Sequence, residues 1–162
     1  MVRVKLEEID HDHSMQPSLR FLPLSAPLTD KVLLAFRKDA GWSNRDTSAV
    51  HKAGQPGGLV QWVTVESGKK RVGIARLELA PPQFCFVSDL IVLSDYRGRG
   101  VGEWFMRQIE QHCMGLGIPR VLLQPMDDNR AFYEKLDFVA DPLAAGFLKK
   151  DIRPPQRRIL PF

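Results

Sequence analysis

Residues 89–103 read DLIVLSDYRGRGVGE, and this stretch decides which fold the rest of the chain can build. It begins as an apolar run typical of a buried strand and ends in residues that open a helix. Between the two lie three alternating glycines, Gly98, Gly100 and Gly102. Glycine lets a backbone take positive φ and approach a ligand closely. A helix start has free N–H groups and a positive dipole end, so the turn is suited to bind a phosphate.

Two common glycine-based phosphate sites do not fit this spacing. A dinucleotide fold needs G-x-G-x-x-G in its first strand–helix unit and an acidic residue about 20 positions later. Here the pattern is G-x-G-x-G, and it follows a predicted hairpin in the middle of the chain. A nucleoside-triphosphate loop needs Gly-Lys-Ser or Gly-Lys-Thr, which the stretch lacks. That the glycines serve only tight packing stays open at this point.

The segments around the turn predict strands and helices in mixed order. Strands are expected over residues 19–24, 59–66, 71–79, 84–93, 120–124, 138–140 and 147–149. Helices are expected over residues 30–40, 47–52, 101–116 and 129–136. The strand at 84–93 is nearly all apolar, so we expect it to be central and buried on both faces. The order predicts an α/β or α+β fold with helices on the faces of a mixed sheet.

Composition limits the class of protein. The chain has 162 residues, 44% of them apolar and 26% charged, which predicts one folded domain over 19–152 with an extension at 1–18 and a tail at 153–162. A net charge of +4 suits a polyanionic cofactor and is too small to indicate a nucleic-acid partner. With no apolar signal core and no apolar run near the roughly 20 residues of a membrane span, we expect a cytoplasmic protein without a membrane partner.

Cysteine and histidine give little evidence of a metal site. Cys85 and Cys113 lie in different predicted elements without metal-type spacing, so reduced thiols are expected. His11 and His13 flank Asp12, but a closed site needs three or four converging ligands. A solvated tail is the favoured interpretation, and we predict no metal.

Two separated motifs resemble one superfamily. The pattern Arg97-x-x-Gly100-x-Gly102 resembles the R/Q-x-x-G-x-G/A signature of the GNAT acyltransferases. Residues 128–138 read DNRAFYEKLDF and resemble the family's N-x-x-F-Y-E-K-x-G-F stretch, seen for example in glucosamine-phosphate N-acetyltransferases. The motifs come in the family's order, and the resemblance covers roughly residues 58–140. By this resemblance the chain is identified as a member of the GNAT superfamily.

The resemblance implies a fold and a co-substrate. The fold would be a mixed, mostly antiparallel sheet, splayed between two parallel strands and flanked by helices. The co-substrate would be acetyl-coenzyme A, with its pantetheine arm hydrogen-bonded to exposed strand backbone. The residues implied in binding it are Leu90, Ile91 and Val92 for the pantetheine arm, Arg97, Gly98, Arg99, Gly100, Val101 and Gly102 for the pyrophosphate, and Asn129 for a further contact.

The same resemblance implies catalytic roles. Tyr133 would protonate the departing thiolate, which a phenol of pKa ~10 can do for a thiol of pKa ~8.5; the alternative is a packed aromatic. Many relatives use a strand glutamate as general base where this chain has Phe86. Asp89 matches the aspartate of the D-[IL]-x-V stretch in relatives and is the candidate base, with a structural role as the alternative. Glu78 acting through water is the second candidate.

One position departs from the family pattern. The family usually has glycine where this chain has Asp137, at a place that often ends the helix in the left-handed region. Aspartate tolerates that conformation better than most residues, so we expect the fold to be kept.

The acceptor is predicted as the primary amine of a small molecule, attacking directly in a ternary complex. Two alternatives stay open: an acetyltransferase acting on a protein N-terminus or lysine, and a non-catalytic acyl-coenzyme A-binding domain. The acceptor cleft would be built by residues 29–52, with Phe36, Trp42 and Arg45 as candidate lining residues. A homodimer is expected only by analogy with the superfamily.

Overall fold

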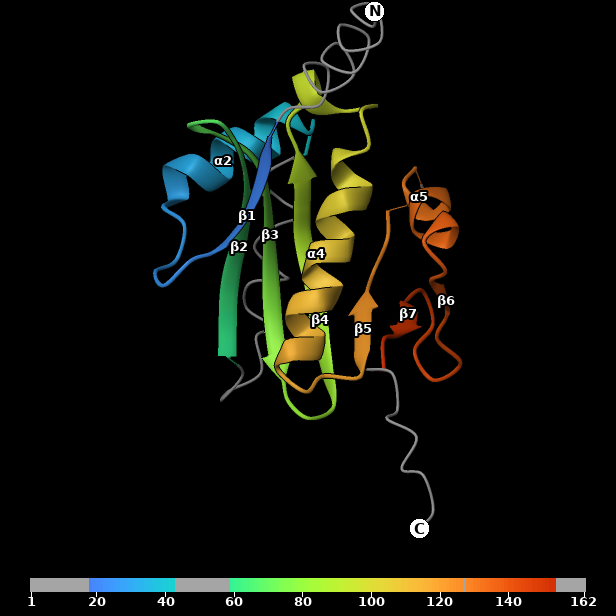
Figure 1. Cartoon of the computed structure of the whole chain (residues 1–162). Coiled ribbons are helices and arrows are strands. Elements are labelled where there is room, and N and C mark those ends of the chain that lie inside the picture. Colours follow the sequence, from blue (N-terminus) through green and yellow to red (C-terminus); the bar gives the residue numbers. More distant parts are fainter. Residues whose placement is uncertain (1–17, 43–58, 127, 154–162) are drawn as a thin grey trace, which may run out of the picture.

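A seven-stranded mixed sheet organises the molecule (Figure 1), for which the computed structural model describes residues 18–42, 59–126 and 128–153. The strand order is β1-β2-β3-β4-β5-β7-β6, and every neighbouring pair is antiparallel except β4 and β5. The strands are β1 (Leu19–Pro23), β2 (Leu59–Ser67), β3 (Lys70–Ala80), β4 (Phe84–Val92), β5 (Arg120–Leu123), β6 (Val139–Ala140) and β7 (Leu148–Asp151). The predicted fold class is confirmed.

Helices cover both faces of this sheet. They are α2 (Asp30–Asp39), α4 (Val101–Gly115) and α5 (Arg130–Lys135), and a short 3-10 turn, η1 (Ser94–Tyr96), follows β4. Helix α2 begins where the Thr29 hydroxyl accepts a hydrogen bond from the Val32 N–H, and Gly41 follows it with φ +75°. Helix α4 runs four turns, as its apolar spacing predicts. No helix in the described part of the chain is long and apolar enough to cross a membrane.

The main core lies between α4 and the sheet. Phe105, Met106 and Ile109 of α4 are fully buried against apolar side chains of the central strands. Gly73 of β3 lies directly below this helix, and a Cβ there would come within 3.3 Å of the Phe105 ring. Residue 73 is therefore glycine because the helix packs close to the strand.

A smaller apolar cluster lies under α2 on the opposite face. Leu33 and Phe36 of the helix are buried against Trp62, Ile74 and Ile91 of the strands. Phe36 is 6% exposed, so the prediction that it lines an acceptor cleft is corrected to a core position. The sequence alone misplaces Phe36 because the apolar spacing of a helix does not distinguish a core residue from one that lines a pocket.

Three other expectations have different outcomes. Asp137 ends α5 with φ +71°, so the predicted left-handed conformation is confirmed. The predicted helix over 47–52, Arg45, and the His11–Asp12–His13 segment lie outside the described residues. Both cysteines are buried free thiols.

Strand β4 contains an extra residue. Two of its residues, Asp89 and Leu90, lie opposite the single residue Ala75 of β3, because the pairing register shifts at that point. Asp89 takes a positive φ of +50°. A β-bulge of this kind bends its strand and changes which side chains face each side of the sheet. Leu90 and Val92 therefore face the α4 core, while Ile91 faces α2.

Strands β4 and β5 part just before this bulge. Their parallel pairing joins residues 85–87 to residues 121–123, and β5 ends there. Residues 88–92 continue β4 past that end, and Figure 1 shows the β4 arrow running beyond the tip of the β5 arrow. The five residues are thus left without a β5 partner.

The expectation that β4 is buried on both faces is wrong in part. Cys85, Val87 and Ile91 are buried, whereas Phe86 and Ser88 are only half-buried. The apolar run indicated a strand packed between two layers. The parting from β5 leaves Ser88, Leu90 and Val92 in the second half of β4 only half-buried, whereas Phe86 lies within the stretch that pairs with β5.

Candidate functional site

The glycine loop takes the conformation that its sequence predicts. Gly98 and Gly100 have φ of +73° and +79°, and an added Cβ at either would meet nothing within 4 Å. Glycine is needed there for the backbone conformation, not for space. Gly102 differs: it lies in the first turn of α4, and a Cβ there would approach the Phe132 ring to 3.2 Å. Tight packing therefore explains only the third glycine.

The two sequence motifs line one cavity of about 400 Å³. It lies beside the unpaired half of β4, at the start of α4 and against α5. Its lining residues are Leu90, Val92, Arg97, Gly98, Gly100, Val101, Gly102, Glu103, Asn129, Phe132 and Tyr133. Most residues that the resemblance implicated in cofactor binding are thus together.

Three residues from the predicted site lie elsewhere. The Ile91 side chain is buried under α2, so only its backbone is available to the cavity. Arg99 lines a neighbouring cavity of about 470 Å³, with its guanidinium 5.9 Å from the Tyr96 ring centre. Asp89 is not among the lining residues of the main cavity.

Backbone groups of β4 point toward the opening. The N–H of Leu93 donates to the Val72 carbonyl of β3 at 2.9 Å. Successive N–H groups of a strand point to opposite sides, so the Val92 N–H points away from β3. The Val92 carbonyl accepts from Arg97 Nε at 2.9 Å on that same side. The backbone at Val92 therefore faces the space that β5 leaves free.

Arg97 is held at the rim of the cavity. Besides its bond to Val92, its Nη2 donates to Asp39 Oδ2 at 3.3 Å. The side chain is 47% exposed, which leaves part of the guanidinium accessible. The start of α4 adds N–H groups that have no partner within the helix. An anion bound here would meet oriented positive groups from both sources.

Asn129 carries an unpartnered polar atom. Its Oδ1 is buried, has no hydrogen-bond partner among the residues that the structure describes, and belongs to a residue that lines the cavity. Buried polar atoms are almost always hydrogen-bonded, because an unpaired one costs free energy. The site is thus missing a donor at this point, as expected where a ligand binds.

Tyr133 is fixed among aromatic rings. Its ring centre lies 5.1 Å from that of Phe132 and 5.8 Å from that of Phe138, both edge-on. The residue is 6% exposed, and burial raises the pKa of its phenol above the usual value. The hydroxyl therefore stays protonated at neutral pH in a cavity-lining position.

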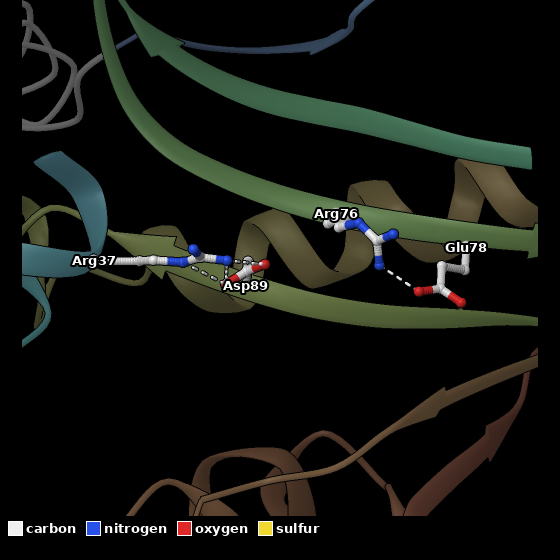
Figure 2. A network of polar contacts seen from close by, with 4 residues as sticks. All are labelled: Arg37, Arg76, Glu78 and Asp89. Carbon is white, nitrogen blue, oxygen red and sulfur yellow. Dashed lines mark hydrogen bonds and ion pairs between the residues drawn. The ribbon is translucent and has the colours of Figure 1, made fainter. Parts of the chain in front are cut away.

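Asp89 is engaged by an arginine that sequence reasoning missed (Figure 2). Arg37 Nε donates to Oδ1 at 3.1 Å, and Arg37 Nη2 donates to Oδ1 and Oδ2 at 3.0 Å each. The side chains are only 6% and 8% exposed. The sequence does hold a signal that Arg37 is buried, because Arg37 follows Leu33 by four residues and so lies on the same buried face of α2. With both oxygens accepting from Arg37, the contacts favour the structural role for Asp89.

A second charged pair lies on the neighbouring strand β3 (Figure 2). Arg76 Nη1 donates to Glu78 Oε1, and the Glu78 side chain remains 20% exposed. Glu78 pairs across the sheet with Phe86 of β4, and Arg76 pairs with Ser88, whose buried Oγ has no hydrogen-bond partner within the described part of the chain. A carboxylate therefore lies directly across the sheet from Phe86.

Comparison with known proteins agrees with this geometry. Residues 28–138 match the model of the Acetyltransferase (GNAT) family. The chain belongs to the GNAT acetyltransferase family. The matched range contains the bulged strand, the glycine loop and the tyrosine helix.

Individual GNAT proteins resemble the chain to different extents. Glucosamine 6-phosphate N-acetyltransferase 1 of Oryza sativa subsp. japonica is 33% identical over 60 residues, a stretch that covers 37% of this chain and 36% of the rice protein. PaiA N-acetyltransferase from Thermoplasma acidophilum, solved in complex with coenzyme A, superposes with a TM-score of 0.63 at 14% identity, covering 83% of this chain and 99% of that one. The ribosomal-protein-S18-alanine N-acetyltransferase of Escherichia coli gives 0.57 at 16%, covering 88% and 100%. At these identities the two structures show the shared fold.

Proposed function

We propose that the chain is an acetyl-coenzyme A-dependent N-acetyltransferase that acetylates the primary amine of a small molecule by direct attack in a ternary complex. The observation that carries the proposal is one cavity lined by both the glycine loop and the tyrosine helix, beside strand backbone that has no β5 partner. The rice relative named above is itself an N-acetyltransferase of an amino sugar phosphate, and PaiA was solved with coenzyme A.

The cavity suits the donor in three respects. The loop from Gly98 to Gly102 and the start of α4 offer N–H groups to a diphosphate, with Arg97 beside them. The backbone of residues 90–92, which has no β5 partner, offers hydrogen-bonding groups of the kind that an extended pantetheine arm pairs with. The unpartnered Asn129 Oδ1 would accept a hydrogen bond from the same ligand. Phosphate, amide and hydroxyl groups of acetyl-coenzyme A thus each find complementary partners.

Tyr133 is proposed as the general acid. The amine nitrogen attacks the thioester carbon, the carbon–sulfur bond breaks, and the sulfur takes the phenolic proton as it leaves. Burial raises the pKa of the phenol, so the hydroxyl is protonated before the reaction, but it is a weaker acid than a free phenol and gives up its proton only as the thiolate develops. Edge-on contacts with Phe132 and Phe138 fix the ring, so little reorientation is needed. The Val92 N–H would stabilise the negative charge that develops on the carbonyl oxygen.

Glu78 is proposed as the group that takes the proton of the amine, through water. Only one of its oxygens pairs with Arg76, and its side chain keeps access to solvent. Asp89 is proposed instead to position the bulge, because Arg37 occupies both of its oxygens. A carboxylate with a free oxygen accepts a proton more readily than one held by a bidentate arginine.

The substrate class is tested by a turnover screen. We expect free thiol to be released from acetyl-coenzyme A with amino sugars, amino acids or polyamines, and acetylation of the amine to be seen by mass spectrometry. Turnover only with peptides that present an N-terminus or lysine would favour a protein acetyltransferase. Tight donor binding without turnover on any acceptor would favour a non-catalytic binding domain.

Donor binding is tested at Gly100. Glutamate there places a carboxylate at the phosphate position and forces a side chain into positive φ, so Gly100→Glu should abolish acetyl-coenzyme A binding in calorimetry. Gly117→Glu is the matched control, because Gly117 has φ +75° and open space around it at the far end of α4. Both variants should lose similar thermal stability. Equal affinity for the donor in the two variants would refute the assignment.

The acid and the base are separated by two variants. Tyr133→Phe should lower kcat by roughly 10²-fold with little change in donor affinity, since general acids contribute about 10²–10⁴-fold. Glu78→Gln should lower kcat with little change in the KM for acetyl-coenzyme A, because the carboxylate acts on the amine and not on the donor. Wild-type turnover by either variant would rule out the role proposed for the residue it changes.

A further inference from the structure

The last turn of α2 contacts the phosphate-binding loop through Asp39. Its Oδ2 accepts from the Ser94 N–H at 2.9 Å and from Arg97 Nη2 at 3.3 Å, and its Oδ1 accepts from the Ser94 hydroxyl at 2.9 Å. These residues are 55 and 58 positions away in the sequence. A single carboxylate thus holds both the start of η1 and the arginine that lines the cavity.

The position of Ser94 matters for the glycine loop. Ser94 begins η1, and the Arg97 N–H donates to its carbonyl at 3.2 Å, so the segment that leads into Gly98 and Gly100 starts from this anchored residue. Fixing Ser94 at two atoms therefore limits where the following backbone N–H groups can lie. Preorganised donors bind an anion better than mobile ones, because less conformational freedom is lost on binding.

Arg97 is oriented by the same carboxylate. The Val92 carbonyl holds Nε and Asp39 holds Nη2, so two acceptors on different elements define the plane of the guanidinium. A long cationic side chain loses much rotamer freedom when it binds a phosphate. Asp39 removes part of that cost in advance. Both side chains are partly exposed, so the charge of Asp39 is screened by water and its orienting effect outweighs its repulsion of a phosphate.

We propose that Asp39 is a positioning residue for the donor, setting the affinity for the diphosphate part of acetyl-coenzyme A from a helix on the opposite face of the sheet. This inference rests on the proposed function. The same helical turn also carries Arg37, which holds the bulge of β4. One turn of α2 therefore fixes both the bulge and the phosphate loop.

Asparagine gives a sharp test of this role. In Asp39→Asn the amide oxygen can accept from the Ser94 N–H and from Arg97, while the amide nitrogen donates to the Ser94 hydroxyl. The variant removes the charge and keeps the geometry. Asp39→Ala removes both. Asp30→Asn is the matched control, because it removes a charge from the first turn of the same helix, away from the loop.

The experiment compares two donors on the full chain. With acetyl-coenzyme A, Asp39→Ala should raise KM about tenfold, as expected from the loss of the hydrogen bonds that orient Ser94 and Arg97, and kcat should stay within about twofold. With S-acetylpantetheine, which lacks the diphosphate, KM should not change. Asp39→Asn and Asp30→Asn should stay close to wild type with both donors, and circular dichroism should show all variants folded.

Each other result has a defined meaning. An equal rise in KM for both donors would show a general structural role and overturn the proposal. Tighter binding of acetyl-coenzyme A by Asp39→Asn would show that charge repulsion dominates, and would also overturn it. Calorimetry with coenzyme A distinguishes failure of the proposed function from failure of the role of Asp39. If the wild-type chain does not bind coenzyme A, the proposed function is overturned. If wild type and Asp39→Ala bind it equally well, only the role of Asp39 is overturned.

Discussion

The buried ion pair between Arg37 and Asp89 fixes the point at which β4 changes its course. Asp89 is the extra residue of the bulge and holds a positive φ, which costs free energy in a non-glycine residue. Arg37 binds both of its oxygens from α2. A buried pair of this kind adds little net stability, because desolvation offsets the attraction. Its effect is positional: it holds the strained residue in the conformation that the rest of the site requires.

The bulge determines which side chains of β4 face each side of the sheet. Leu90 and Val92 are turned toward the α4 side, where the glycine loop and Tyr133 lie. Glu78 and Arg76 lie on the opposite face of the sheet, and they pair across the strands with Phe86 and Ser88. In the proposed function the donor and the amine therefore approach from opposite faces, and the reacting atoms meet where β4 and β5 part. The parting itself needs no special residue, since β5 simply ends while β4 continues.

Much of this architecture could be predicted from the sequence, because it is encoded locally. Gly98 and Gly100 predict positive φ, the apolar spacing predicts α4, and the tolerance of aspartate for the left-handed region accounts for Asp137. The bulge could not be predicted, because an apolar strand with one extra residue has the same composition as one without it. The Asp89 role could not be decided either, since its partner lies 52 residues away. Burial of β4 was overestimated because a strand beside an open cleft is as apolar as one packed between two layers.

The account rests on one claim: that the unpaired half of β4 and the start of α4 together form the donor site. A titration of the isotope-labelled chain with coenzyme A, followed through its backbone amide resonances, tests this most directly. The largest shift changes are predicted at residues 90–92 and 98–102. Unchanged resonances there, with changes concentrated around the neighbouring cavity of Leu19, Trp104 and Arg107, would contradict it.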